Sequence, residues 1–313
     1  MSKISVIGAG DVGATCANVM AQNELASEVV MLDIKEGFSE GKALDMMQTA
    51  ALLEFDTRIR GVTNDYNATA DSDVVVITSG IARKPGMSRE DLIGVNAGIV
   101  KDVTQKVLKY SPNAVIVVVT NPVDTMTYLA LKTGGLPQNR VIGMGGMGDR
   151  TRFKYYLSRA LNCTFSDIDA TVIGGHGDAT MIPLTRFATF SGIPVSHLLN
   201  ADILKQVVAD TMVGGATITR LIGTSAWYAP GAASARLVKA IIYDQKKVYP
   251  CCVALNGEYG QTDICIGVPV IVGNNGWEKI IDYNLNSEEQ ALFGKSADAV
   301  RKMNQVLVDM NLL

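Results

Sequence analysis

The chain has 313 residues, of which 48% are hydrophobic and 19% charged, and its net charge is −3 at pH 7. This amount of apolar material predicts a large core, held in one large domain or in two closely joined ones. No apolar run is long enough to cross a bilayer, no secretory signal is visible and no basic block occurs. We therefore expect a cytoplasmic protein with no membrane or nucleic-acid partner.

Five cysteines and two histidines limit the metal and redox chemistry that the chain can carry. The cysteines are odd in number and show no C-x-x-C spacing, which indicates buried thiols in a reducing compartment more than a disulfide framework. His176 and His197 form no histidine cluster, so we expect no metal site.

The first half of the chain alternates short β-branched runs with longer helical patterns. Strands are predicted at residues 4–7, 29–32, 58–62, 74–78, 115–120 and 141–143, and helices at 12–22, 41–53 and 91–108. The strand cores are apolar without alternation, which is typical of parallel strands covered on both faces. This rhythm predicts an α/β fold with an N-terminal Rossmann domain, a doubly wound parallel sheet that binds ligands at the carboxyl ends of its strands.

Residues 143–148 are rich in Gly and Met, and the alternation weakens after them. Helical segments at 150–161, 202–221 and 232–243 then mix with strands near 168–173, 253–258 and 265–272. We expect a boundary near residue 145. It separates a cofactor-binding domain, residues 1–145, from an α+β catalytic domain, residues 146–313.

The first predicted strand runs into a G-x-G-x-x-G pattern that opens a helix, formed by Gly8, Ala9, Gly10, Asp11, Val12 and Gly13. Gly8 permits a tight turn, Gly10 lets the backbone approach a pyrophosphate, and Gly13 allows close packing of helix on strand. The helix N-terminus adds free N–H groups and a positive dipole end. In this strand–turn–helix context the pattern predicts a dinucleotide site.

Asp33 ends the second predicted strand, twenty positions beyond Gly13. Its carboxylate could accept hydrogen bonds from both hydroxyls of the adenosine ribose, and its charge would repel a 2′-phosphate. The cofactor is therefore predicted to be NAD and not NADP. FAD is disfavoured because the chain has no second nucleotide signature.

A candidate catalytic group follows the strand at 168–173. His176 has glycines on both sides, which we expect to leave room for a ligand, and Asp149 and Arg152 lie three apart at the predicted start of a helix. The carboxylate could orient the imidazole while the guanidinium binds a substrate carboxylate. Without the cofactor loop, a turn histidine and an exposed ion pair would be the simpler interpretation.

A basic loop over residues 82–89 follows the strand at 74–78 and contains Arg83, Lys84 and Arg89. Such loops can close over substrates, although a solvated charged loop is the alternative. Asn121-Pro122 ends the strand at 115–120, so the Asn side chain is expected to face the cofactor crevice.

Taken in chain order, these motifs resemble those of the lactate and malate dehydrogenase family, over essentially the whole chain. The loop at 83–89 is similar to the version in malate-specific members, and the chain resembles the lactate-dehydrogenase-like branch. One departure is visible. The family commonly carries a Leu-Asp-Ser-Ala-Arg run, whereas this chain has Gly148-Asp149-Arg150-Thr151-Arg152, and only Asp149 and Arg152 match.

The resemblance implies a role for each charged residue of the site. His176 would take up and return the proton, with Asp149 as its partner. Arg152 would bind the C1 carboxylate of the substrate, Arg83 would bind the distal carboxylate, and Arg89 would polarise the C2 oxygen.

The resemblance also implies that Asn121 contacts substrate and cofactor, and that Asn96, Val119, Thr120 and Asn121 line the NAD site. The expected reaction is reversible hydride transfer between malate, a small dicarboxylate, and NAD, in a homodimer or homotetramer. Two alternatives stay open: a lactate dehydrogenase, and a catalytically silent NAD-binding scaffold protein.

Overall fold

The computed structural model describes residues 2–82 and 88–313. Arg83 and Lys84 lie outside the described residues, as does the side chain of Arg89. Within the described ranges, no helix is both long enough and apolar enough to cross a membrane.

Six parallel strands in the order β3-β2-β1-β4-β5-β6 make up the first half of the sheet. Their bounds are β1 Lys3–Ile7, β2 Glu28–Asp33, β3 Arg58–Thr63, β4 Val74–Ile77, β5 Val115–Val118 and β6 Val141–Gly143. Ile4 pairs with Val29 on one side and with Val74 on the other. Strand order reverses between β1 and β4, which is where a sheet of this kind opens a ligand crevice. The predicted doubly wound sheet is confirmed.

Helices cover both faces of this sheet: α1 Asp11–Gln22, α2 Phe38–Gln48, α3 Ala50–Leu53, α4 Arg89–Tyr110 and α5 Val123–Gly134. The single helix predicted over residues 41–53 is wrong, because the chain divides at Thr49 into α2 and α3. The Thr49 hydroxyl donates to the Met46 carbonyl at 2.7 Å, a local bond that competes with helix continuation.

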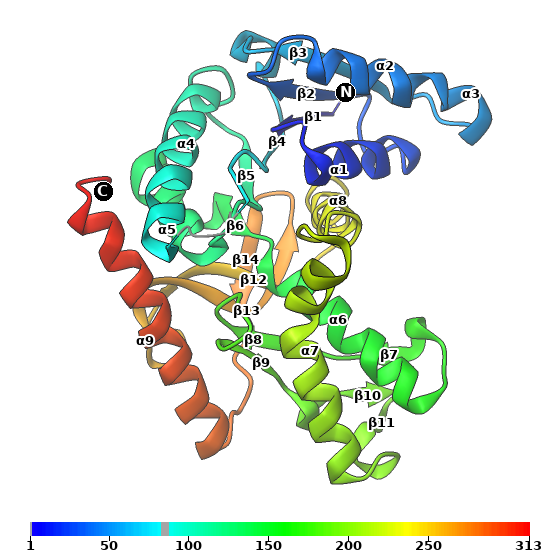
Figure 1. Ribbon diagram of the computed structural model, residues 1–313, viewed down its shortest axis with the longest axis vertical. Coiled ribbons are helices and arrows are strands. Elements are labelled where there is room, and N and C mark those ends of the chain that lie inside the picture. Colours follow the sequence, from blue (N-terminus) through cyan, green and yellow to red (C-terminus); the bar gives the residue numbers. More distant parts are fainter. Residues whose placement is uncertain (1, 83–87) are drawn as a thin grey trace.

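The second half extends the same sheet with antiparallel strands β12 Lys247–Asn256, β13 Thr262–Gly273, β8 Val172–Gly174, β9 Met181–Pro183 and β14 Gly276–Ile280. Cys252 of β12 pairs with Gly143 of β6, so the sheet continues across residue 145. A small sheet of β7 Ile168–Asp169, β10 Thr189–Phe190 and β11 Ile193–Pro194 lies at the end of the molecule opposite β3 (Figure 1). The one strand predicted at 168–173 is therefore wrong: the chain changes sheet between β7 and β8.

The remaining long helices are α6 Gly145–Leu161, α7 Ala201–Ile222, α8 Tyr228–Ile242 and α9 Ser287–Asp309. Short 3-10 helices occur at Tyr66–Thr69, Gln138–Arg140, Phe165–Asp167, Thr185–Phe187, Val195–His197 and Glu258–Gly260. Helix α6 begins five residues before the predicted start, so Asp149 and Arg152 lie inside it and not at its first turn. Its glycines serve packing, because a Cβ on Gly146 would come within 2.8 Å of the Pro250 carbonyl oxygen.

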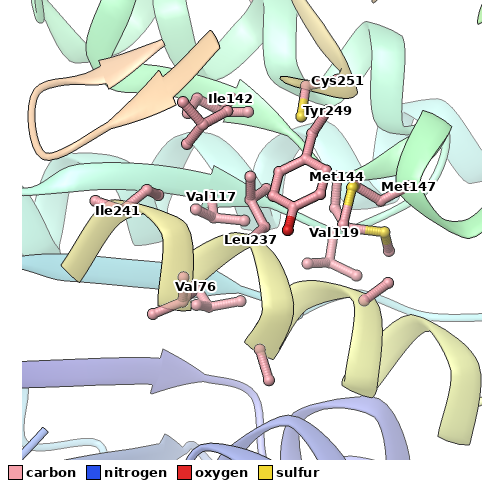
Figure 2. Packing of buried hydrophobic residues seen from close by; sticks show 14 of the residues in the cluster. Val76, Val117, Val119, Ile142, Met144, Met147, Leu237, Ile241, Tyr249 and Cys251 are labelled. Carbon is pink, nitrogen blue, oxygen red and sulfur yellow. The ribbon is translucent and has the colours of Figure 1, made fainter. Parts of the chain in front are cut away.

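The two halves share a hydrophobic core. Helix α8 belongs to the second half, yet it lies beside α1 of the first half (Figure 1). Figure 2 shows Leu237 and Ile241 of α8 packed near Val76, Val117 and Ile142 of the parallel sheet. The core of the first half is therefore completed by residues from the second half of the chain.

Candidate active site

The turn after β1 has the geometry of a phosphate cradle. Gly8 has φ +104°, and a Cβ there would come within 2.8 Å of Thr78 Oγ1. A Cβ on Gly13 would overlap the Gly8 carbonyl oxygen, which is the close contact between helix and strand that the pattern predicts. A Cβ on Gly10, in contrast, would meet nothing within 4 Å, and Gly10 caps α1 without a side-chain hydrogen bond. The turn thus leaves open space in front of free helix N–H groups, which suits an anion.

Asp33 lies at the end of β2, beside this turn. Its Oδ2 accepts a hydrogen bond from the Ala9 N–H at 2.7 Å, and its Oδ1 accepts one from the Lys35 N–H at 3.0 Å. The carboxylate is therefore held at the rim of the cradle, next to the strand end where a ribose would follow the pyrophosphate. Together, the open space at Gly10 and the carboxylate at Asp33 fit NAD.

Two polar side chains join the segments that follow β4 and β5. Asn96 of α4 is buried, and it accepts from the Ile81 N–H at 2.8 Å and donates to the Asn121 carbonyl at 2.8 Å. Thr120 donates to the Ser79 carbonyl at 2.7 Å. These bonds bring the two segments to one edge of the crevice. The side chains of Asn96 and Thr120 bond the protein backbone here, and Val119 follows β5 directly, while the Asn121 side chain is exposed at the end of that strand.

The basic loop at 83–87, including Arg83 and Lys84, falls outside the described residues. The described structure resumes at Ser88. Its hydroxyl accepts a hydrogen bond from the Asp91 N–H at 2.9 Å, and the Asp91 carboxylate accepts one from the Ser88 N–H at 3.1 Å. This reciprocal cap starts α4 at Arg89.

His176, Asp149 and Arg152 form one hydrogen-bonded cluster. Nδ1 of His176 lies 2.7 Å from Oδ2 of Asp149, and Arg152 donates to the other oxygen, Oδ1, at 3.2 Å. Asp149 is 1% exposed, so both of its bonds are shielded from water. Nε2 of His176 has no hydrogen-bond partner among the residues that the structure describes. It is the imidazole atom left free for a ligand.

The charges of this cluster set the protonation of the imidazole. Burial by itself would lower the pKa of His176, but the Asp149 carboxylate opposes it through its charge and its hydrogen bond. These effects of Asp149 prevail, and the pKa of His176 is raised above its ordinary value. The site therefore stabilises the protonated imidazole.

The cluster lies at the same sheet edge as the cofactor cradle. A Cβ on Gly145, the residue that starts α6 just after β6, would come within 2.9 Å of the His176 Cβ. His176 thus packs against the carboxyl end of the parallel sheet. The imidazole, the cradle at Gly10 and the exposed Asn121 are all at strand ends, where a doubly wound sheet binds its ligands.

The glycines around His176 also have a packing role, which the sequence did not predict. Gly174 has φ +88°, and a Cβ on Gly175 would come within 2.8 Å of Val300 in α9, so the two glycines before His176 fit the turn against α9. A Cβ on Gly177, after His176, would come within 3.0 Å of Thr180 Oγ1. Arg150 and Thr151, which depart from the family run, also point away from the site. Arg150 pairs with Asp169 at 2.6 Å, and Thr151 bonds the Gly148 carbonyl.

Three groups of residues near the cluster were not predicted from the sequence. Asp124 of α5 is buried and accepts from the His176 N–H at 2.7 Å. Ser296 of α9 accepts from the Gly175 N–H at 2.8 Å. Gly214 and Gly215 of α7 face Arg152, and a Cβ on Gly215 would come within 3.3 Å of its guanidinium. The glycine pair inside a long helix was the only local signal, because the other contacts join distant segments.

The described residues contain no group of three His, Cys, Asp or Glu side chains placed to hold a metal ion. What the arrangement can do follows from its parts. A carboxylate-held imidazole exchanges a proton, a partly buried guanidinium binds a carboxylate, and a cradle beside them holds a dinucleotide.

Comparison with known proteins agrees with this geometry. A family model described as the lactate/malate dehydrogenase NAD binding domain matches residues 2–143, and the alpha/beta C-terminal domain of the same family matches residues 148–308. A malate dehydrogenase from Parabacteroides distasonis is 66% identical over 313 residues, covering 100% of both chains.

Solved structures share the fold over nearly the full length. Malate dehydrogenase from Salinibacter ruber has a TM-score of 0.94 at 44% identity, covering 99% of this chain and 98% of its own. A lactate dehydrogenase from Cryptosporidium parvum, in complex with lactic acid and β-nicotinamide adenine dinucleotide, has a TM-score of 0.93 at 36% identity and 98% coverage of each chain. The backbone therefore does not distinguish the two substrates, and side chains must do so.

Proposed function

The chain belongs to the lactate/malate dehydrogenase family, and on that premise we propose that it catalyses the reversible, NAD-dependent oxidation of malate to oxaloacetate. The observation that carries this proposal is the cluster in which Asp149 holds His176 on one oxygen and Arg152 on the other, at the sheet edge that also carries the cofactor cradle. The name of the 66% identical relative supports malate over lactate.

His176 is the proton acceptor and donor in this proposal. Bound NAD supplies the redox chemistry, as acceptor of the hydride from C2 of malate. Asp149 accepts the Nδ1–H of His176, which leaves Nε2 bare in the neutral ring and ready to take the proton of the C2 hydroxyl. The positive imidazole that results is stabilised by the same buried carboxylate. In the reverse direction the protonated imidazole returns its proton to the oxygen.

Three arginines are assigned to the substrate. Arg152 binds the C1 carboxylate, and its position on the Asp149 carboxylate supports this role. Arg83 binds the distal carboxylate and Arg89 polarises the C2 oxygen, two assignments that rest on the resemblance of the loop. Asn121 contacts substrate and cofactor from the end of β5. On the cofactor side, Asp33 and the glycine turn are supported by their geometry.

The experiment that tests this proposal compares oxaloacetate with pyruvate. Pyruvate would enclose Arg83 without its partner, which can cost several kcal/mol. We expect a preference for oxaloacetate of at least about 1,000-fold in kcat/KM, or roughly 4 kcal/mol. Arg83→Gln should reduce this preference mainly by losing oxaloacetate, whereas Lys84→Gln, the matched control beside it, should keep it. A wild-type enzyme that favours pyruvate is a lactate dehydrogenase, and one that turns over neither substrate is a scaffold.

We further infer a homo-oligomer, a dimer or a tetramer, in the cytoplasm. An interface between copies of the chain would cover large apolar side chains that are more than 60% exposed here: Ile34, Leu44, Leu52, Leu221 and Tyr228. The five cysteines are free, and four of them are buried, which suits a reducing compartment. Sedimentation analysis of the purified enzyme measures the assembly.

A further inference from the structure

A second buried carboxylate lies under the His176 turn. Asp124 is 1% exposed, its Oδ2 accepts from the His176 N–H at 2.7 Å, and its Oδ1 accepts no hydrogen bond from a nitrogen or oxygen of the described residues. The Cys252 thiol is the one other donor close to this carboxylate within the described structure, and a thiol is a weak donor. A buried carboxylate with so few strong hydrogen bonds is costly, and such groups are rare in protein cores. The first turn of α5 would gain from any acid through the helix dipole, but that gain needs no burial and no contact with His176.

The surroundings of Asp124 contain little that neutralises it. The titratable groups that face it from neighbouring elements are His176, Asp149 of α6, Cys252 of β12 and Cys265 of β13. Burial raises the pKa of Asp124 to about 6, against the hydrogen bonds from the His176 N–H and the Cys252 thiol and the charge of His176, so the carboxyl is still mostly charged at neutral pH. Its charge also acts on the imidazole, where it favours the protonated form alongside Asp149.

The His176 turn is therefore held through its main chain by two side chains of different charge. Asp124 accepts from the His176 N–H, and Ser296 accepts from the Gly175 N–H at 2.8 Å while it donates to the Thr180 carbonyl at 2.8 Å. Ser296 can contribute position alone, whereas Asp124 can contribute position and charge. This difference makes the two effects separable by experiment.

We propose that Asp124 is a positioning residue for His176, which fixes the main chain beneath the imidazole and, together with Asp149, stabilises its protonated form. The inference rests on the proposed function only in that His176 is the residue that transfers the proton. Asp124 itself touches neither the reacting atoms nor the imidazole nitrogens in this assignment.

The test is an NMR titration of the histidine ring protons in the intact enzyme, without substrate. The chain has only two histidines, His176 and His197, so a His176→Asn spectrum identifies each resonance. Asp124→Asn keeps the shape and an acceptor for the His176 N–H but removes the charge. We expect the His176 midpoint to fall by about half a pH unit or more, about threefold in proton affinity. The falling limb of oxaloacetate reduction should move to lower pH by the same amount, with NADH affinity unchanged.

Two companion variants separate charge from position. Ser296→Ala should lower kcat by about tenfold without moving the His176 midpoint, because it loosens the turn but removes no charge. Thr125→Val is the matched control: Thr125 is buried next to Asp124 in α5, and its hydroxyl has no partner in the described structure. It should change neither the midpoint nor kcat.

Several outcomes would overturn the inference. An Asp124→Asn midpoint within about 0.2 unit of wild type, or an equal shift in Thr125→Val, removes the charge effect. If Asp124→Asn does not fold, the wild-type His176 resonance must still show a second, smaller step as Asp124 titrates, and the absence of such a step at any pH where the enzyme is folded contradicts the proposal. A wild-type enzyme that does not reduce oxaloacetate would contradict the proposed function instead. The NMR titration needs no turnover, so it tests the role of Asp124 independently of that result.

Discussion

At the scale of single residues, the role proposed for His176 predicts the pH dependence of both directions. Its pKa is raised, because Asp149 outweighs the effect of burial. Oxaloacetate reduction needs the protonated ring, so its kcat/KM should be level at low pH and fall as pH rises through this raised pKa. Malate oxidation needs the neutral ring and should rise over the same range. Initial rates across pH in both directions measure the two midpoints, which should agree.

Replacing the imidazole provides the check on that assignment. His176→Asn keeps a polar side chain of similar reach but cannot carry the proton, so kcat should fall by at least about 100-fold. NADH binding, followed by fluorescence, should stay nearly unchanged because the cradle is formed by β1 and α1. A variant with wild-type turnover would rule out His176 as the proton-transfer residue.

Cofactor choice should follow Asp33, the carboxylate that Ala9 holds at the rim of the cradle. A 2′-phosphate would meet this charge in a partly desolvated crevice, so NADH should be preferred to NADPH by at least about tenfold in kcat/KM, or roughly 1.4 kcal/mol. Asp33→Ser keeps an acceptor but removes the charge, and it should narrow the gap by improving NADPH. Equal use of both cofactors by the wild-type enzyme would contradict this role.

At the scale of elements, two helices fix the position of Arg152. Helix α6 carries the guanidinium and α7 presents Gly215 to it, where a Cβ would come within 3.3 Å of the guanidinium nitrogen Nη1 and 3.4 Å of Nη2. An added methyl group would shift the guanidinium by a few tenths of an ångström, so Gly215→Ala should lower kcat/KM for oxaloacetate by about tenfold. Stability should not fall, because alanine is favoured over glycine inside a helix by up to about 1 kcal/mol.

The matched control for this prediction is Gly294→Ala in α9, where a Cβ would meet nothing within 4 Å. It should raise the Tm slightly and leave the kinetics unchanged. Steady-state kinetics and thermal unfolding, measured for both variants and the wild-type enzyme, give the kcat/KM and Tm values to compare. If Gly215→Ala has wild-type kcat/KM, close contact between α7 and Arg152 is not needed for substrate binding.

Some elements could be predicted from local sequence patterns, and others could not. Strands β4 and β5 are continuous apolar runs, so they could be predicted without knowing their neighbours, whereas β3 at the sheet edge carries the exposed Arg58 and Arg60 between its apolar residues. Residues 143–148 look like a loop, because glycine normally weakens a helix, yet Gly145 and Gly146 start α6 where His176 and Pro250 leave no room for a Cβ. The cofactor motif is local and was readable. The role of Asp124 could not be predicted in this way, because its hydrogen-bond partner is the main chain of a residue 52 positions away.

At the scale of the whole molecule, one hydrophobic core extends across the domain boundary that we expect near residue 145. The sheet continues from β6 to β12, and α8 of the second half covers β4, β5 and β6 of the first. Because α8 of the second half completes the core of the cofactor-binding half, the stability of each half should depend on the other. We therefore expect the chain to unfold as one cooperative unit, although many chains of two domains do not.

Leu237 of α8 tests this coupling, because it is fully buried against Val76 and Val117 (Figure 2). Leu237→Ala leaves a cavity there and should destabilise the fold by about 2–5 kcal/mol. For a chain of this length that corresponds to a loss of roughly 3–8 °C in Tm. Leu292→Ala makes the same chemical change at an exposed position of α9 and should alter stability by no more than about 0.5 kcal/mol.

Calorimetry at one fixed protein concentration gives the decisive comparison, because assembly makes the Tm depend on concentration. If the halves share one core, Leu237→Ala should move a single transition as a whole, and the loss of NADH binding should coincide with the loss of ellipticity. Two separate transitions, of which Leu237→Ala moves only one, would show that the halves are independent. In that case the continuous sheet and the α8 contact would contribute little to the stability of the cofactor half, contrary to what their burial implies.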